Sequence, residues 1–105
     1  GAHERGGTTV GILPGSDRVS GNKYLDIAIA TGMGDARNAL IARSSCGVIA
    51  VGGEFGTLSE IAFCLKFGVP VVGLMTWELK EKRFPSGLPL FDSPAEAVDT
   101  IFQKI

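Results

Sequence analysis

The sequence predicts a parallel α/β fold of the Rossmann-like type, in which helices flank a sheet. Runs rich in Val, Ile and Leu, at residues 8–13, 48–51 and 71–75, have the continuous apolar character of strands that are buried on both faces. Helical segments of about 10–12 residues alternate with strands, which is the pattern of βαβ units in a parallel sheet.

The length of 105 residues allows one domain, which we place at 1–105 as a partial Rossmann-like domain that binds a nucleotide or a phosphate. The predicted sheet has about four strands, fewer than such domains usually carry. We therefore expect the N-terminal βα units of the fold to be lacking.

The first third of the chain contains two predicted strands. Residues 1–7 look like the end of a helix, because two glycines close a polar stretch. The strand 8–13 ends in a turn at Pro14–Asp17. Residues 24–30 alternate larger apolar with smaller or polar side chains, which favours a short strand or an extended segment.

Two helices are predicted in the middle of the chain. Asp35 is a suitable N-cap for a helix that runs to about Ser45. A second helix is expected to open at Thr57 and to end at Phe67, where Gly68 can form the glycine cap.

The last third is expected to begin with a loop and to end in a helix. Residues 76–92 are mostly loop-like, with a short strand at 88–91. Ser93–Glu96 has the capping-box pattern with proline at the first helical position, so a helix should follow to the end of the chain.

Composition excludes several classes of function. The net charge is −1 with no long charged run, which argues against a nucleic-acid or membrane-surface partner. No stretch approaches the roughly 20 apolar residues of a membrane span, and residues 1–7 lack the apolar core of a signal peptide. Cys46 and Cys64 are far apart and His3 is the single histidine, which favours a cytoplasmic protein without a metal site or a resident cofactor.

The segment Gly52–Thr57 is the strongest candidate site. A strand, then glycines, then a helix start is an arrangement that binds phosphate, because glycines admit an anion and the first helical turn has unpaired N–H groups. The alternative is a tight turn whose glycines only fit the geometry. The segment matches neither G-x-G-x-x-G nor a Walker A loop. The ligand-binding candidates are Gly52, Gly53, Phe55, Gly56 and Thr57.

Two carboxylates near this loop need separate interpretations. Thr57 and Glu60 have capping-box spacing, so Glu60 either closes the helix end or faces the ligand. Glu54 would repel a phosphate if it pointed inward, so we expect it to point to solvent. Trp77 is more often a packing residue than a base-stacking residue.

Arg37 is the remaining candidate. It should lie in the first turn of the helix that begins at Asp35, where a cation opposes the helix dipole. Either a ligand or an ion pair with Asp35 or another carboxylate explains that position.

The stretch Met33–Leu74 resembles the LOG (Lonely Guy) family. The resemblance is carried by Arg37, by the loop Gly52–Thr57 and by Glu60 at matching intervals. A LOG-like subgroup related to the molybdenum cofactor carrier proteins is more similar to this chain than the LOG enzymes are. The segments Gly7–Pro14 and Gly32–Leu40 carry this closer resemblance.

The resemblance implies a Rossmann-like fold, homodimers or higher homo-oligomers, and a phosphorylated small-molecule ligand. LOG enzymes are phosphoribohydrolases, which cleave the bond between a base and ribose 5′-monophosphate. By resemblance the loop would hold the 5′-phosphate, while Arg37 and Glu60 would be catalytic residues beside the ribose. The old family label of lysine decarboxylase has no support, because no lysine is clearly buried.

Three departures from the LOG pattern favour the carrier-like subgroup. Asn38 stands where LOG enzymes have Lys, Gly52 where they have Pro, and Glu54 where they have Gly. The leading hypothesis is therefore binding of a phosphorylated nucleotide-like or pterin-like ligand. A phosphoribohydrolase is the first alternative, and a truncated domain with only a self-association role is the second.

Overall fold

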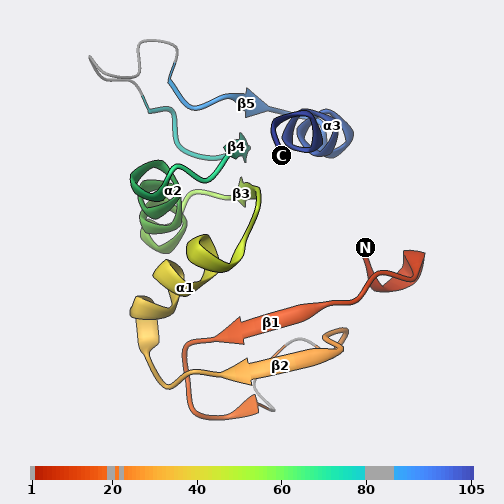
Figure 1. Cartoon of the computed structure of the whole chain (residues 1–105), viewed down its shortest axis with the longest axis vertical. Helices are drawn as coiled ribbons and strands as arrows, with labels where there is room; N and C mark the ends of the chain where they lie inside the picture. Colours follow the sequence, from red (N-terminus) through yellow and green to blue (C-terminus); the bar gives the residue numbers. More distant parts are fainter. Residues whose placement is uncertain (1, 19–20, 22, 80–86) are drawn as a thin grey trace. The chain divides into compact units, whose positions relative to one another are not determined.

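A computed structural model of the chain describes residues 2–18, 21, 23–79 and 87–105. These residues form two compact units, Gly1–Arg37 and Asn38–Ile105. Every strand pair among the described residues is parallel, as the sequence predicts (Figure 1). Among the described residues, no helix has the length and apolar content needed to cross a membrane.

The first unit is built on two parallel strands. A short 3-10 turn, η1 (His3–Arg5), ends at Gly6 with a left-handed φ of 79°, which is the glycine cap expected there. Strands β1 (Val10–Leu13) and β2 (Ile27–Ala30) then pair along their full length.

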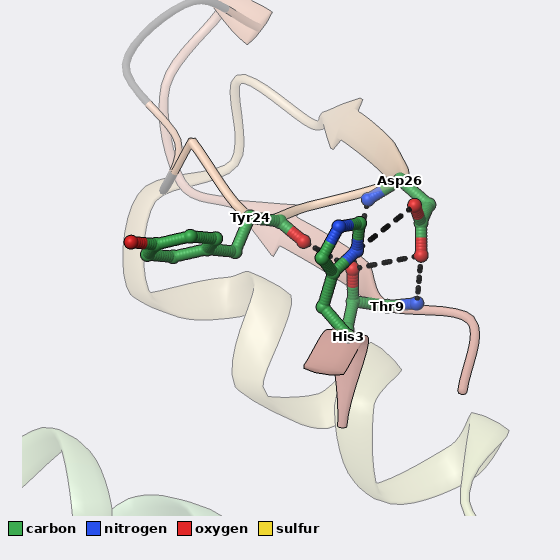
Figure 2. A network of polar contacts seen from close by, with 4 residues as sticks. All are labelled: His3, Thr9, Tyr24 and Asp26. Carbon is green, nitrogen blue, oxygen red and sulfur yellow. Dashed lines mark hydrogen bonds and ion pairs between the residues drawn. The ribbon is translucent and has the colours of Figure 1, made fainter. Parts of the chain in front are cut away.

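A polar network closes the amino ends of β1 and β2 (Figure 2). The Asp26 carboxylate accepts hydrogen bonds from the Thr9 N–H at 2.7 Å and from the Thr9 hydroxyl at 3.1 Å. That hydroxyl also lies 2.6 Å from the Tyr24 carbonyl, and His3 Nδ1 is 3.4 Å from Asp26 Oδ1. The network therefore joins η1 to both strands.

This network predicts acid sensitivity of the first unit. The hydrogen bonds from Thr9 N–H and Thr9 Oγ1, aided by His3, hold the pKa of Asp26 below its ordinary value of 3.8. A carboxylate with a lowered pKa stabilises the fold above its unfolded pKa, and this contribution is lost as the pH falls below about 4 through the folded pKa. Asp26→Asn should therefore be less stable than the wild type at pH 7, and the difference should shrink toward pH 2.

The titration of the Asp26 carboxyl carbon, followed by NMR, checks the prediction directly. Asp99→Asn, which removes one exposed carboxylate from another part of the chain, is the control for net charge. A midpoint at or above the ordinary aspartate value would show that Thr9 does not stabilise the ionised form.

The first α-helix begins later than the sequence predicts. A 3-10 turn, η3 (Gly34–Ala36), precedes α1 (Arg37–Ser44), so Asp35 lies inside the turn and the prediction that it is the N-cap is wrong. The N-cap of η3 is Met33, which makes no side-chain cap bond. Gly34 has a φ of 56°, a left-handed conformation that interrupts helical geometry here.

The second unit contains a three-stranded sheet in the order β3-β4-β5. Strands β3 (Val48–Val51) and β4 (Val71–Leu74) match the predicted runs, and β5 (Leu90–Phe91) confirms a short strand within 88–91. The predicted loop at 76–92 is described only outside residues 80–86.

Two helices cover opposite faces of this sheet (Figure 1). Helix α2 (Phe55–Phe67) ends at Gly68, which has the left-handed φ expected of a cap. Helix α3 (Pro94–Lys104) begins after Ser93, whose side chain accepts a hydrogen bond from the Glu96 N–H, so the capping prediction is confirmed for this bond.

The core of the second unit is divided by the sheet. Successive residues of a strand point to opposite faces, and neighbouring positions of β4 belong to different clusters. On the α2 side the buried residues are Ala42, Ala50, Ile61, Cys64, Val71 and Leu88. On the α3 side they are Val72, Ala97 and Ile101. The sheet is thus held by packing on both faces.

Candidate functional site

The glycine loop lies at the carboxyl end of β3, where ligands bind in open α/β sheets. Gly52 has a φ of 88°, and Glu54 is the N-cap in an extended conformation. Helix α2 begins at Phe55, so the predicted start at Thr57 is two residues too late. Gly56 and Thr57 consequently belong to the first helical turn.

The first turn of α2 presents backbone N–H groups that have no partner inside the helix. The first helical bond is donated by the Leu58 N–H to the Glu54 carbonyl at 3.1 Å. The Glu54 side chain makes no cap hydrogen bond and is exposed, as expected. The amides of Phe55, Gly56 and Thr57 therefore form the donor set that an anion would meet.

Two of the three loop glycines have no internal reason to be glycine. Gly52 needs its positive φ, but the φ values of Gly53 and Gly56 lie outside that region. A Cβ built on Gly53 or Gly56 would meet no atom of the described residues within 4 Å, apart from chain neighbours and the backbone of α2 itself. The missing side chains leave open space beside the amide donors.

The position of Thr57 and Glu60 in α2 removes one interpretation of Glu60. A capping box needs its hydroxyl at the N-cap, but Thr57 is the third helical residue and Glu60 the sixth. The capping-box interpretation is therefore wrong. Glu60 is half-buried in the second turn, and the Thr57 hydroxyl lies 3.5 Å from the Val51 carbonyl.

Asn38 supports the same turn from α1. It is 2% exposed, and its Nδ2 donates to Ser59 Oγ at 2.8 Å and lies 3.5 Å from the Gly56 carbonyl. Ser59 Oγ donates to that carbonyl at 2.8 Å. Sequence reasoning treated Asn38 only as a departure from a family pattern. Its spacing of four residues from Ala42, the other buried residue of α1, was the available signal.

An aromatic pair lies beside the loop. The Phe55 and Trp77 rings stack with centroids 5.8 Å apart and planes at 26°. Trp77 Nε1 donates to the Glu54 carbonyl at 3.2 Å, and Trp77 packs against the core on the α2 side, as expected of a packing residue. Phe55, in contrast, is 79% exposed.

Arg37 lies in the first unit, whereas the loop and Glu60 lie in the second. Arg37 Nη1 donates to the Ile12 carbonyl in β1 at 3.0 Å. Its Nε is buried and has no hydrogen-bond partner among the described residues, and these residues form no ion pair between Arg37 and Asp35. The structure therefore rejects the Asp35 ion pair as the explanation of Arg37.

A hollow of about 490 Å³ lies away from the loop, beside Pro70 and Val71 at the amino end of β4. Cys64 lines it, but burial and, next, the charge of Glu60 raise the pKa of this thiol, which disfavours the reactive thiolate. The described residues contain no group of three His, Cys, Asp or Glu side chains that could bind a metal. This hollow therefore offers neither a reactive thiolate nor a metal site.

Fold and site together define a Rossmann-like parallel α/β protein with a glycine loop at a helix N-terminus. The family model described as the SLOG cluster4 family (LDcluster4) matches residues 1–98. The chain therefore belongs to the SLOG cluster4 family.

Solved structures place the chain near the molybdenum cofactor carrier proteins. The molybdenum cofactor binding protein of Rippkaea orientalis superposes with a TM-score of 0.85 at 35% identity, covering 98% of this chain and 66% of that one. The molybdenum cofactor carrier protein of Chlamydomonas reinhardtii gives a TM-score of 0.80 at 41% identity, covering 98% and 65%. The predicted resemblance and fold class are confirmed.

A further relative is an uncharacterized protein of Archaeoglobus fulgidus, 44% identical over 99 residues. The match covers 94% of this chain and 62% of that protein. The chain thus spans somewhat less than two thirds of the length of these three relatives.

Proposed function

We propose that this chain binds a phosphorylated nucleotide-like or pterin-like ligand, with the phosphate at Gly52–Thr57. One observation carries the proposal: the first-turn amides of α2 face space that Gly53 and Gly56 leave open. Helix N-termini attract anions through these amides and through the helix dipole. The alternative of a purely geometric turn accounts for Gly52 alone.

The relatives support the choice of ligand class. Two related structures are named for binding or carrying the molybdenum cofactor, and we propose a ligand of that kind, with a ring and a phosphate, for this chain. The ligand is cargo in this proposal, and the protein supplies donors and shape. The Thr57 hydroxyl, held weakly at 3.5 Å by the Val51 carbonyl, can turn to donate to a phosphate oxygen.

Arg37 is proposed as a ligand contact of the first unit. A buried N–H donor without a partner costs about 1–3 kcal/mol, and Arg37 Nε is such a donor among the described residues. Its anchor on the Ile12 carbonyl fixes the guanidinium at the carboxyl end of β1. A ligand oxygen at this end would satisfy the remaining donor.

The direct test is calorimetric titration with ribose 5-phosphate, with ribose as the matched compound that lacks the anion. We expect saturable binding of ribose 5-phosphate that weakens as salt is raised, because the contact is electrostatic, and no binding of ribose. Equal heats from both compounds, or none from ribose 5-phosphate and inorganic phosphate, would reject the phosphate site.

A phosphoribohydrolase is the second candidate, and the position of Glu60 favours it. Glu60 is not a cap residue, and it lies one turn beyond the proposed phosphate donors in a half-buried position. A carboxylate there is suited to stabilise an oxocarbenium-like centre or to orient water.

Glu60→Gln should abolish release of free base from 5′-mononucleotides if this activity exists. The measurement is chromatographic detection of the base over a panel of nucleotides. Glu96→Gln, an exposed glutamate on α3, is the matched control and should leave the rate unchanged. Base release that persists in Glu60→Gln, or no release by the wild type, would reject the hydrolase.

We also propose that the chain self-associates into a homodimer or a higher homo-oligomer. Helix α3 and its C-cap residue leave an apolar stripe of Val98, Phe102 and Ile105 exposed at helical spacing. A second copy that presents the same stripe would cover it with two-fold symmetry. Light scattering that finds only a monomer at high concentration would reject this part of the proposal.

A further inference from the structure

We infer that Phe55, supported by Trp77, is a stacking platform for a flat heterocycle carried by the phosphorylated ligand. The inference rests on the proposed function and assigns the ring of the ligand to a particular side chain. It predicts that the protein prefers phosphates with a planar ring over phosphates without one.

Trp77, which supports Phe55, is itself held by two kinds of contact. Trp77 packs partly in the core on the α2 side and donates from Nε1 to the Glu54 carbonyl, so contacts at both ends hold its indole. Phe55 stacks on that indole at 5.8 Å and 26°. One face of the Phe55 ring is therefore supported by the indole.

The remaining surface of Phe55 is open. The side chain is 79% exposed although phenylalanine usually buries a large apolar area. Gly53 and Gly56, on either side of Phe55 in sequence, add no side chain that could cover it. A planar ring that lies on this surface would extend the stack that Trp77 begins.

The position of Phe55 links the ring to the phosphate. Phe55 is the first residue of α2, so its own N–H belongs to the donor set proposed for the anion. Val51 and Met75, which end or follow paired strands at the same edge of the sheet, add exposed apolar surface. An occupant must therefore combine an anionic group with an apolar, flat part.

These features favour a small ligand over a protein partner. Hot spots in protein interfaces are surrounded by further contacts that exclude water, whereas glycines adjoin Phe55 in the loop and in the first turn of α2. A ring with a phosphate meets both the platform and the amides without any further surface.

Flavin mononucleotide is a suitable probe, because its ring is a benzo-fused pteridine and it has no N-glycosidic bond to a ribose that the alternative activity could cleave. Ribitol 5-phosphate carries the phosphate without the ring, and riboflavin carries the ring without the phosphate. Calorimetry gives the three affinities. Trp77 is the single tryptophan of the chain, so its fluorescence reports binding of the flavin ring near the platform.

For the wild type we expect flavin mononucleotide to bind about tenfold more tightly than ribitol 5-phosphate, since stacking of a base on an aromatic ring has an effect of this order. Phe55→Leu should remove this preference, so that the variant binds flavin mononucleotide and ribitol 5-phosphate with similar affinity. Phe55→Tyr should retain the preference. Only the ring-bearing phosphate should change the Trp77 fluorescence at low concentration.

The outcomes separate this inference from the phosphate site. Equal affinities for the two phosphates, or a preference that survives in Phe55→Leu, would overturn the platform and leave the phosphate site standing. Absence of binding by both phosphates would overturn both. Loss of self-association in Phe55→Leu without any effect of the ring would assign Phe55 to an interface and also overturn the platform.

Discussion

Gly56→Ala is expected to make the free protein more stable and its phosphate binding at least tenfold weaker. The two effects have opposite signs because they arise from different states of the molecule. The first concerns the helix without ligand, and the second concerns the space that a ligand would occupy.

The gain in stability follows from helix propensity. Gly56 is the second residue of α2, and its φ lies outside the left-handed region. Alanine is favoured over glycine by up to about 1 kcal/mol within a helix, with a smaller gain near the end. The added methyl group would meet no described atom within 4 Å, apart from chain neighbours and the backbone of α2, so no clash opposes this gain.

The loss of affinity follows from the direction of the new side chain. The Cα–Cβ bond of a helical residue tilts toward the helix N-terminus, which is where the proposed phosphate lies. A methyl group at position 56 would hold the anion away from the first-turn amides. A tenfold loss corresponds to about 1.4 kcal/mol, comparable to one hydrogen bond to a charged group.

Urea unfolding and calorimetric titration with ribose 5-phosphate measure the two effects on the same samples. Gly53→Ala tests the neighbouring open position, and Lys66→Ala, an exposed substitution in the last turn of α2, is the control for distant changes. A variant that gains stability and binds ribose 5-phosphate as tightly as the wild type would mean that the glycine is unrelated to ligand approach.

The strands of the second unit could be predicted because their signals are local. β3 is a continuous apolar run, and β4 lies between Pro70 and the loop that follows it. The end of α2 was equally predictable, since Gly68 supplies a left-handed cap that most other residues avoid. In these places one residue or a short run determines the backbone.

The starts of α1 and α2 were predicted less accurately because contacts distant in sequence decide them. Capping preferences amount to about 1 kcal/mol, and Thr57 and Glu60 have the spacing of a box that the helix does not use. The bond from Trp77 to the Glu54 carbonyl joins residues 23 positions apart and fixes the turn. No local pattern contains that bond.

The polar contacts of the site were the least predictable part. The Arg37 bond to Ile12 spans 25 positions, and the Asn38 bond to Ser59 spans 21. Such bonds depend on which helix packs beside which strand, and residue type alone does not specify this. Sequence reasoning found the glycine loop because its chemistry lies within six consecutive residues, Gly52–Thr57.

Ile61→Ala is expected to lower the free energy of unfolding of the second unit by roughly 2–5 kcal/mol, because removing a fully buried Ile leaves a cavity. Ile61 is 0% exposed and belongs to the cluster that joins α2 to β3 and β4. Domains of this size have total stabilities of about 5–15 kcal/mol. The substitution therefore removes a large share of the free energy of unfolding, and with it the packing that holds α2 against the sheet.

Leu65→Ala is the matched control, since Leu65 lies one turn later on α2 and is 38% exposed. Leu65→Ala should lower the free energy of unfolding much less, because the Leu65 side chain is already partly exposed to water in the folded protein. Urea unfolding followed through Trp77 fluorescence reports on the second unit, and an unchanged slope with a lower midpoint would identify a change in stability.

The position of Ile61 also connects stability with binding. Ile61 follows Glu60 directly and anchors the helix whose first turn presents the proposed phosphate donors. A ligand that binds only the folded form stabilises it by mass action, so saturating ribose 5-phosphate should raise the unfolding midpoint of Ile61→Ala. An equal loss in the Ile61 and Leu65 variants would contradict the packing of α2, whereas a folded Ile61→Ala protein without binding would mean that the cavity displaces the loop itself.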